Sequence, residues 1–278
     1  MLEELMEGKK WEELNMDWLV NVLGRVGIES LLLDIPFVCK SWFKATLSSL
    51  CWRRLNFSQV STARLMYKYE IKFCSISTMK FVVNRSDRCA TYLSLPNRSL
   101  TDEALTYVAD GCPNLRTFVL PYGLPYEHML KITNLINKWK SLEYLTLGAS
   151  CFQLQGIIYQ INIHCNNFVG LGVPSAYIGK SDASAIASLL PNIKELDLRC
   201  ANIEKEYLVM ILKGCKELEY VDVSYCEGFD EGDIDILKLA SHIHTFKPEG
   251  SMMFYSDYDE WDDNDDFDLD EMYYCGYS

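Results

Sequence analysis

Carboxylates are the first residues in this sequence whose types and spacing could do chemistry. Glu195 and Asp197 lie two residues apart, and Glu219 and Asp222 follow in a similar short segment, a spacing that could pair carboxyl groups for general acid–base work. No histidine stands at metal-ligand spacing from a cysteine or carboxylate, and no Cys-x-x-Cys pair occurs. A glycine-rich phosphate loop and a Gly-x-Ser-x-Gly elbow are also absent. We therefore predict no catalytic residue, no cofactor and no metal site.

A repeat gives these carboxylates a simpler explanation. The segment Asn192–Leu198 has the pattern of a short strand, with apolar residues at Ile193, Leu196 and Leu198. The template apolar-x-x-apolar-x-apolar recurs with steps of 25, 27, 26, 25, 25 and 25 residues. Its copies begin at Ala90, Leu115, Leu142, Phe168, Ile193, Leu218 and Ile243. A steady period in the mid-twenties is the signature of a leucine-rich repeat.

A second column of apolar residues supports the same period. It lies seven residues before the anchors, and other apolar residues at helical spacing accompany it. Its members are Val108, Leu135, Ile161, Ile186, Ile211 and Ile236. Each unit is therefore predicted to be a helix, a turn and a strand that stacks on its neighbours. The predicted fold is an α/β leucine-rich-repeat solenoid, a horseshoe of short parallel strands and helices.

The first unit of this array is longer than the others. Cys51–Phe57 fits the strand template, but 38 residues separate Trp52 from Ala90. We expect the first strand over 51–57 and the helix of this unit over 61–74. Gly111 and Gly214 are expected to end later helices, as glycine often does.

The x positions of the strand template are expected to face the concave side, where parallel strands form an extended binding surface. This face becomes more acidic toward the C-terminal end, so we expect a substrate protein with a basic element to bind there. Tyr144 and Tyr220 are predicted aromatic anchors, and reversal of Asp197 and Asp222 to lysine is expected to leave the fold intact. Solvated strand positions without a binding role remain the alternative. The predicted substrate-binding residues are Tyr144, Lys194, Glu195, Asp197, Glu219, Tyr220 and Asp222.

Charge is spread unevenly along the 278 residues, whose net charge is −13. Residues 252–278 hold ten acidic side chains and no Lys or Arg, whereas the rest carries 29 acidic and 26 basic residues. An acidic chain without a basic stripe is a poor candidate for nucleic-acid binding. We expect 252–278 to be a disordered acidic tail. Its aromatic residues leave open a second reading, docking on a basic surface of a partner.

Other features bear on the cellular compartment. No segment reaches the roughly 18 apolar residues of a membrane helix, and the first residues lack a signal-peptide pattern. The eleven cysteines are then expected to be reduced thiols of a protein in the nucleus, the cytoplasm or both, without a membrane partner. Cys112, Cys165 and Cys215 each lie three residues before an anchor, where we expect them to act as small buried apolar residues.

The N-terminal region precedes this array. Residues 1–10 are a predicted extension, and 11–50 have the apolar spacing of three short helices, the second stopped by Pro36. This small unit has more apolar side chains than it can bury, which suggests that a partner covers some of them.

The segment from Leu14 to Val38-Cys-Lys-Ser-Trp42 resembles the F-box, and a repeat array over 51–251 follows it, as in plant F-box/leucine-rich-repeat proteins. This resemblance implies a three-helix F-box over 11–50 that docks on the Skp-type adaptor and, through it, the cullin of an SCF ubiquitin ligase. The array would then hold a protein substrate for ubiquitination, and the chain itself would not be an enzyme. The implied adaptor contacts are Leu14, Leu19, Val22, Leu23, Leu31, Leu32, Val38, Cys39 and Trp42.

Two other functions remain open. The family usually has Leu-Pro where this chain has Leu14-Asn15. This difference favours a leucine-rich-repeat interaction scaffold without a ubiquitin-ligase role, whose N-terminal helices only cover the end of the solenoid. A hydrolase that uses the strand carboxylates is the remaining reading.

Overall fold

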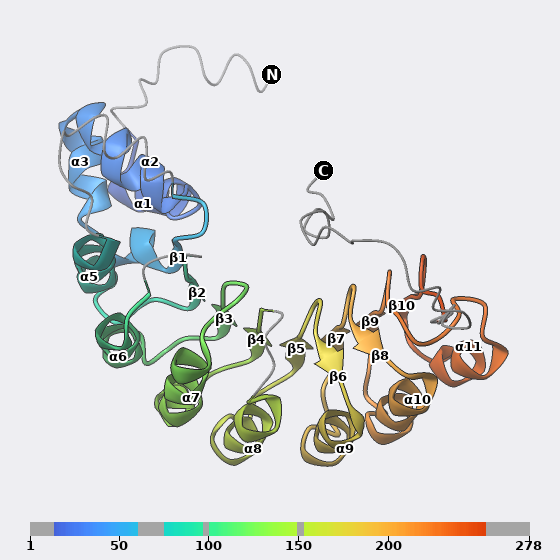
Figure 1. Cartoon of the computed structure of the whole chain (residues 1–278). Helices are drawn as coiled ribbons and strands as arrows, with labels where there is room; N and C mark the ends of the chain where they lie inside the picture. The colour runs from blue at the N-terminus through green and yellow to red at the C-terminus, as the bar shows by residue number, and fades with distance from the viewer. Residues whose placement is uncertain (1–13, 61–74, 97–99, 149–152, 254–278) are drawn as a thin grey trace, which may run out of the picture.

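The computed structural model describes residues 14–60, 75–96, 100–148 and 153–253. The described chain forms a curved solenoid in which strands line the inner side and helices the outer side (Figure 1). A group of short helices stands at its N-terminal end (Figure 1). The predicted α/β leucine-rich-repeat solenoid is therefore confirmed.

The strands of the main sheet are all parallel, and most follow one another in chain order. In the described residues they are β1 (Arg54–Asn56), β2 (Tyr92–Ser94), β3 (Thr117–Val119), β4 (Tyr144–Thr146), β5 (Gly170–Gly172), β7 (Glu195–Asp197), β9 (Tyr220–Asp222) and β10 (Thr245–Lys247). A second, two-stranded sheet pairs β6 (Tyr177–Ile178) with β8 (Asn202–Ile203).

The outer layer consists of one helix for each repeat, together with a short 3-10 turn. These elements are α5 (Ser75–Ser86), α6 (Asp102–Gly111), α7 (Tyr126–Leu135), the 3-10 turn η4 (Ile136–Lys138), α8 (Leu154–His164), α9 (Lys180–Leu189), α10 (Lys205–Gly214) and α11 (Ile234–Ala240). The N-terminal group consists of α1 (Met16–Leu23), α2 (Ile28–Leu33), η2 (Ile35–Phe37), α3 (Lys40–Thr46) and η3 (Ser49–Trp52).

Equivalent residues of successive sequence repeats pair with one another in the sheet. Leu171 pairs with Leu145 on one side and with Leu196 on the other, and Leu196 pairs with Val221. These four side chains are at most 2% exposed. Because each strand is only three residues long, its central side chain is covered by the equivalent residues of its neighbours.

The first repeat differs in part from its prediction. Leu55 pairs with Leu93 across the expected long insertion, but the strand begins only at Arg54, and Trp52 belongs to η3. The helix of this repeat is α5, over 75–86, whereas the predicted helix over 61–74 lies outside the described residues. Val83 lies seven residues before Ala90 and is 2% exposed. It therefore belongs to the column of apolar residues seven before each anchor, and this column could have predicted α5.

Several predicted segments remain untested. The extension over 1–10 and nearly all of the tail over 252–278 lie outside the described residues. The boundaries proposed at 11–50 and 51–251 also remain predictions, because one hydrophobic core runs without interruption from Leu19 to Ile243.

The predicted cysteine column is buried, and the thiols of Cys165 and Cys215 are hydrogen-bonded between repeats. Cys112, Cys165 and Cys215 are at most 4% exposed. The Sγ of Cys165 donates to the carbonyl of Trp139 at 3.5 Å, and that of Cys215 donates to the carbonyl of Leu190 at 3.5 Å. Each acceptor occupies the same column one repeat earlier, so these thiols join neighbouring turns of the solenoid.

The turns after the later strands share an unusual backbone conformation. Ser175, Cys200, Tyr225 and Gly250 have φ angles of +57°, +57°, +56° and +78° at 25-residue intervals. For the first three, which carry a Cβ, this left-handed region is uncommon. Their N–H groups donate to the carbonyls of Arg199, Ser224 and Glu249 in the next repeat, which offsets the strain.

Gly214 is the last residue of α10, as expected, and its missing Cβ allows close helix packing. A Cβ at Gly214 would lie 2.5 Å from the Cβ of Ala187 and 2.9 Å from its Cα. The glycine therefore allows α10 to approach the backbone of α9 closely. A methyl group at this position would push the two helices apart.

Gly214→Ala should lower the free energy of unfolding by about 1–3 kcal/mol, the usual range for overpacking. This outcome opposes the roughly 1 kcal/mol that alanine ordinarily gains over glycine inside a helix. Chemical denaturation would measure the change.

Gly156→Ala in α8 is the matched control, because its new Cβ would meet only the end of the Gln153 side chain at 3.2 Å and Thr133 at 3.5 Å. We expect it to be neutral or stabilising. Equal effects of the two substitutions would contradict the close-approach argument.

Candidate docking surfaces

The short helices at the N-terminal end bury one face in the core that they share with the array. Leu19 and Leu23, four residues apart on α1, are each 1% exposed, as is Leu31 on α2. The side chain of Asn15 accepts a hydrogen bond from the N–H of Asp17 at 2.9 Å and so caps α1. An asparagine cap thus defines the start of this helix where the resembled family usually has proline.

The same helices also carry large apolar side chains that face outward. Trp18 and Val22, again four residues apart on α1, are 70% and 47% exposed. Because α1 packs against α3, and α3 against η2, the exposed residues of these elements belong to one small module. The exposed apolar residues of the module, called here the N-terminal apolar surface, are Met16, Trp18, Val22, Phe37, Val38, Phe43, Leu47 and Leu50.

The burial of the predicted adaptor contacts corrects part of that set. Leu19, Leu23 and Leu31 point into the core and cannot reach a partner in this conformation. Val22 and Val38 are exposed. The other predicted contacts are half-buried, namely Leu14, Leu32, Cys39 and Trp42. The helical pattern includes both faces of α1, so apolar type alone could not separate core positions from surface positions.

Sequence reasoning missed most of the N-terminal apolar surface. Phe37, Phe43, Leu47 and Leu50 were not predicted contacts, although each is at least 45% exposed. Trp18 was assigned only to the helical pattern. Its spacing of four residues from Val22, offset from the Leu19 and Leu23 pair, is the signal that could have found a second apolar face.

The module is joined to the array through buried contacts. The Nε1–H of Trp52 donates to the carbonyl of Thr46 at 2.8 Å, and the Sγ of Cys51 donates to that of Ala45 at 3.3 Å. Both donors lie on η3, directly before β1, whose Leu55 is fully buried. The last turns of the module therefore share a core with the first strand of the array.

On the concave side, the predicted anchor Tyr144 lies along the sheet. Its ring covers Gly170 of the next strand, where a Cβ would come within 2.3 Å of the ring. Its hydroxyl donates to Oε1 of Glu195 on β7 at 3.2 Å. Burial of the tyrosine and the neighbouring Glu195 carboxylate raise the pKa of Tyr144 above its ordinary value. Tyr144 therefore bridges three strands.

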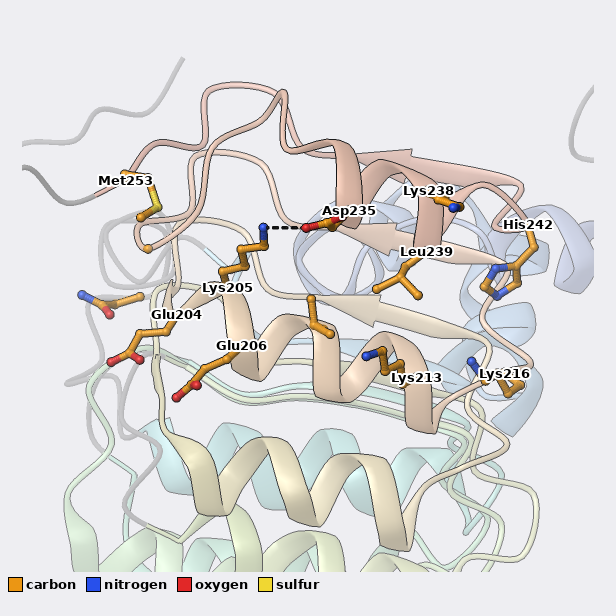
Figure 2. Close-up of a pocket in the computed structure, with 13 residues that line it drawn as sticks. Glu204, Lys205, Glu206, Lys213, Lys216, Asp235, Lys238, Leu239, His242 and Met253 are labelled. Carbon is orange, nitrogen blue, oxygen red and sulfur yellow. Dashed lines mark hydrogen bonds and ion pairs between the residues drawn. The ribbon is translucent and has the colours of Figure 1, made fainter.

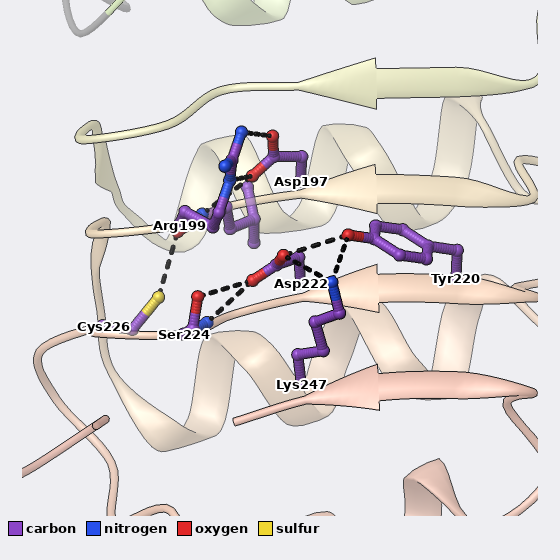
Figure 3. Close-up of polar contacts among 8 residues, drawn as sticks. Asp197, Arg199, Tyr220, Asp222, Ser224, Cys226 and Lys247 are labelled. Atoms are coloured by element: carbon purple, nitrogen blue, oxygen red, sulfur yellow. Dashed lines mark hydrogen bonds and ion pairs between the residues drawn. The ribbon is translucent and has the colours of Figure 1, made fainter. Parts of the chain in front are cut away.

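The charged residues of this face largely neutralise one another. The Nζ of Lys194 lies 2.6 Å from Oε1 of Glu219, and the guanidinium of Arg199 holds both oxygens of Asp197 at 2.8 and 2.9 Å (Figure 3). Arg116 pairs with Glu143 at 3.4 Å. The increasing acidity read from the sequence is therefore offset by cations that stand beside the carboxylates.

Asp222 is a structural residue of the face and not an accessible one. It is 4% exposed, and its Oδ1 accepts from the Oγ of Ser224 at 2.7 Å and from the Ser224 N–H at 3.2 Å. Its Oδ2 accepts from the hydroxyl of Tyr220 at 3.0 Å and lies 3.6 Å from the Nζ of Lys247 (Figure 3). Reversal of Asp222 to lysine would place a cation beside Lys247, so we now expect this substitution to destabilise the fold.

The pKa of Asp222 reflects two opposed effects. Desolvation by burial raises it, but the hydrogen bonds from Ser224 and Tyr220 and the charge of Lys247 outweigh burial and leave it below the ordinary value. Tyr220 in turn accepts from the Nζ of Lys247 at 3.1 Å. The second predicted anchor is thus part of a partly buried polar network.

Cys226, in the turn after β9, forms another contact between repeats. It is fully buried, and its Sγ donates to the carbonyl of Leu198 at 3.0 Å (Figure 3). Burial raises the pKa of its thiol to about 12. Cys200, in contrast, is exposed.

The described residues contain neither a metal-ligand cluster nor a membrane-spanning helix. No group of three or more His, Cys, Asp or Glu side chains that could hold a metal ion occurs there. In the same part of the chain, every helix is too short or too polar to cross a membrane.

The sequence and the structure were compared with those of known proteins. No protein-family model matches the sequence. An F-box/LRR-repeat protein of Arabidopsis thaliana is 29% identical over 235 residues, which cover 78% of this chain and 72% of the relative. This chain is similar to F-box/leucine-rich-repeat proteins.

Other relatives extend the same similarity. The Arabidopsis F-box protein FBW2 is 25% identical over 81% of this chain and 71% of its own length, and the F-box protein SKIP1 is 24% identical over 82% and 83%. Among solved structures, a chain of the yeast Rad7 and Elc1 complex has 19% identity and a TM-score of 0.49 over 82% of this chain. The present chain spans about half, 52%, of that yeast chain.

Thiol alkylation should separate the two cysteines at the edge of the array. At pH 8, iodoacetamide should modify exposed Cys200 and leave Cys226 unmodified, because only the thiolate reacts and the pKa of Cys226 is about 12. Peptide mass spectrometry measures both sites in one sample. Alkylation of both sites at the same rate in the folded chain would contradict the burial of Cys226.

Asp222→Asn should lower the free energy of unfolding at pH 7 by about 1–3 kcal/mol, because buried donors then lose a charged acceptor. Since folding lowers the pKa of Asp222, its contribution is present above the ordinary aspartate pKa of about 3.9 and is lost as pH falls through the folded value. The difference between variant and wild type should therefore shrink below about pH 4.

Denaturant unfolding at several pH values from 7 to 3 measures this difference. Glu217→Gln, at an exposed position before β9, serves as the control and should change stability by no more than about 0.5 kcal/mol. An effect of Asp222→Asn as small as this would exclude a structural role for the carboxylate.

Proposed function

We propose that this chain is the substrate-recognition subunit of an SCF-type ubiquitin ligase. In this proposal the N-terminal apolar surface docks on a Skp-type adaptor and through it on a cullin, and the repeat array holds a protein substrate. The observation that carries the proposal is the combination of a complete core with a second, exposed apolar face on the same short helices. The similarity to proteins named F-box along most of the chain supports it.

The two faces of α1 argue for a partner. Leu19 and Leu23 already bury one side of the helix, whereas Trp18 and Val22 expose the other. A helix that only covers the end of a solenoid needs a single apolar face. An outward tryptophan with 70% of its surface exposed gains energy only when a further surface covers it.

The shared core between the module and the array suits a substrate receptor. The bond from Trp52 to Thr46 and the burial of Leu55 hold the last turns of the module against the first strand. A fixed orientation between the adaptor-binding and substrate-binding surfaces would present the substrate to the transferring subunit in one geometry. The chain would contribute positioning, and other subunits would carry out ubiquitin transfer.

The Leu14-Asn15 sequence is compatible with this role. Asn15 caps α1 through its bond to the N–H of Asp17 and so defines the first turn of the helix without proline. The scaffold reading therefore loses its main support from the sequence. It remains the conclusion if the module binds no adaptor.

For the substrate we propose the concave face over β4, β5, β7 and β9. Because Lys194 is paired with Glu219 and Asp197 with Arg199, the face offers alternating charges and not an acidic field. A substrate segment with both charge signs would match it better than a purely basic one. Asp222 and Tyr220 would support this surface from below, and Lys194, Glu195 and Glu219 would make the contacts.

The test is direct binding of the full chain to a purified Skp-type adaptor, measured by titration calorimetry. The double variant Trp18→Ala with Val38→Asp should weaken binding at least about 30-fold, because it removes an aromatic anchor and places a charge in an apolar interface. Both side chains are exposed, so thermal unfolding of the variant should match that of the wild type.

Ile163→Asp on α8 is the matched control, because this side chain is also apolar and 48% exposed but lies on the outer face of the array. It should bind the adaptor as the wild type does. A folded wild-type chain without saturable binding would refute the ligase proposal and favour the scaffold. Equal weakening by both variants would refute the assignment of the N-terminal apolar surface.

A further inference from the structure

A groove opens between the last two helices of the array, on the side opposite the concave face. It lies between α10 and α11 and has a volume of about 1200 Å³ (Figure 2). Val209 and Leu239, which are partly buried against the core, form its apolar floor.

The charge of the groove changes from one end to the other. Near the start of α10, Lys205 is bound by Asp233 at 2.7 Å and Asp235 at 3.1 Å, so this end is neutralised. At the opposite end, Lys213, Lys216 and His242 lie together, and Lys238 projects from the last turn of α11 (Figure 2).

The three lysines of this second end have no ion-pair partner among the described carboxylates. Lys213, Lys216 and Lys238 are exposed, and no Asp or Glu among residues 14–60, 75–96, 100–148 and 153–253 forms an ion pair with them. Elsewhere on the array the lysines of the concave face stand beside carboxylates, as Lys194 does with Glu219. One end of the groove therefore gathers three lysines that form no ion pair with a described carboxylate.

The described chain reaches this groove just before its acidic segment begins. Met253 lines the groove at the neutralised end, beside Glu204 and Lys205 (Figure 2). Residues 254–278 follow, with ten acidic side chains, no Lys or Arg, and several aromatic residues. The first two, Phe254 and Tyr255, are aromatic, and the acidic run starts at Asp257.

After Met253 the chain has aromatic residues first and acidic residues next, and the groove has its apolar floor first and its basic end next. The ten residues of α10 span about 15 Å, at 1.5 Å per residue. An extended chain covers that length in about five residues. Aromatic side chains at 254–255 would then meet the apolar floor, and the carboxylates from 257 to 263 would reach the basic end.

We propose that the acidic segment after Met253 docks in the groove between α10 and α11 of its own chain. The aromatic residues pack on Val209 and Leu239, and the carboxylates neutralise Lys213, Lys216 and Lys238. An acidic segment of another protein would compete for the same groove.

Zero-length carbodiimide cross-linking of the full chain tests this proposal, because it joins only lysine amines and carboxylates that are in contact. Peptide mass spectrometry should find links from Lys213, Lys216 or Lys238 to carboxylates of 257–271, and 1 M salt should abolish them, because it screens exposed charges. Links confined to lysines outside the groove would overturn the proposal. Links whose yield rises with protein concentration would indicate a second copy and also overturn it.

Chymotrypsin cleavage at the aromatic residues of 254–278 gives an independent measurement. The triple reversal Lys213→Glu, Lys216→Glu and Lys238→Glu should increase the cleavage rate at least tenfold at low salt. The matched control reverses three exposed lysines far from the groove, Lys44, Lys140 and Lys180, and should leave the rate unchanged. Equal rates in the wild type and the groove variant would refute docking, as would an equal increase in the control.

Discussion

In-register pairing of short parallel strands is the interaction on which the rest of the structure depends. A strand of three residues with one helix behind it cannot bury its own central side chain, so Leu171 is covered only because Leu145 and Leu196 stand beside it. This requirement explains why the period stays at 25 to 27 residues. A residue added inside one of these strands would move its leucine out of line with both neighbours. The first repeat accommodates its insertion outside the strand and keeps Leu55 level with Leu93.

The same register places polar groups from successive repeats side by side. Lys194 and Glu219 form an ion pair because they occupy neighbouring strands at equivalent heights, and Cys215 reaches the Leu190 carbonyl for the same reason. Left-handed residues such as Cys200 recur because each turn must direct an N–H group toward the next repeat. Much of the polar chemistry in this protein therefore stabilises the stack, and a carboxylate such as Asp222 that seems available in the sequence is already engaged.

Two of the proposed binding surfaces lie where the stacking of repeats stops. Interior repeats have neighbours on both sides, whereas the two ends of the solenoid do not. At the N-terminal end, short helices bury Leu19 and Leu23 and still expose Trp18 on the other side. At the C-terminal end, a groove between α10 and α11 holds lysines that form no ion pair with a carboxylate of the described residues. Both ends thus carry apolar or charged surfaces that no neighbouring repeat covers. Both surfaces are suited to binding another segment of protein.

The sequence by itself determined the repeat, its period, the parallel array and the burial of Cys112, Cys165 and Cys215, because these follow from the spacing of apolar residues along the chain. The tertiary structure decided which of those apolar residues remain exposed. Leu19 and Val22 have the same type and lie on the same helix, and only the packing of α1 against α3 separates core from surface. Tertiary structure also decided which carboxylates are paired, since the partners of Asp222 include Lys247 from the next repeat. Spacing along the chain records the direction of a side chain within its own element, but the neighbour that covers or neutralises it comes from another element.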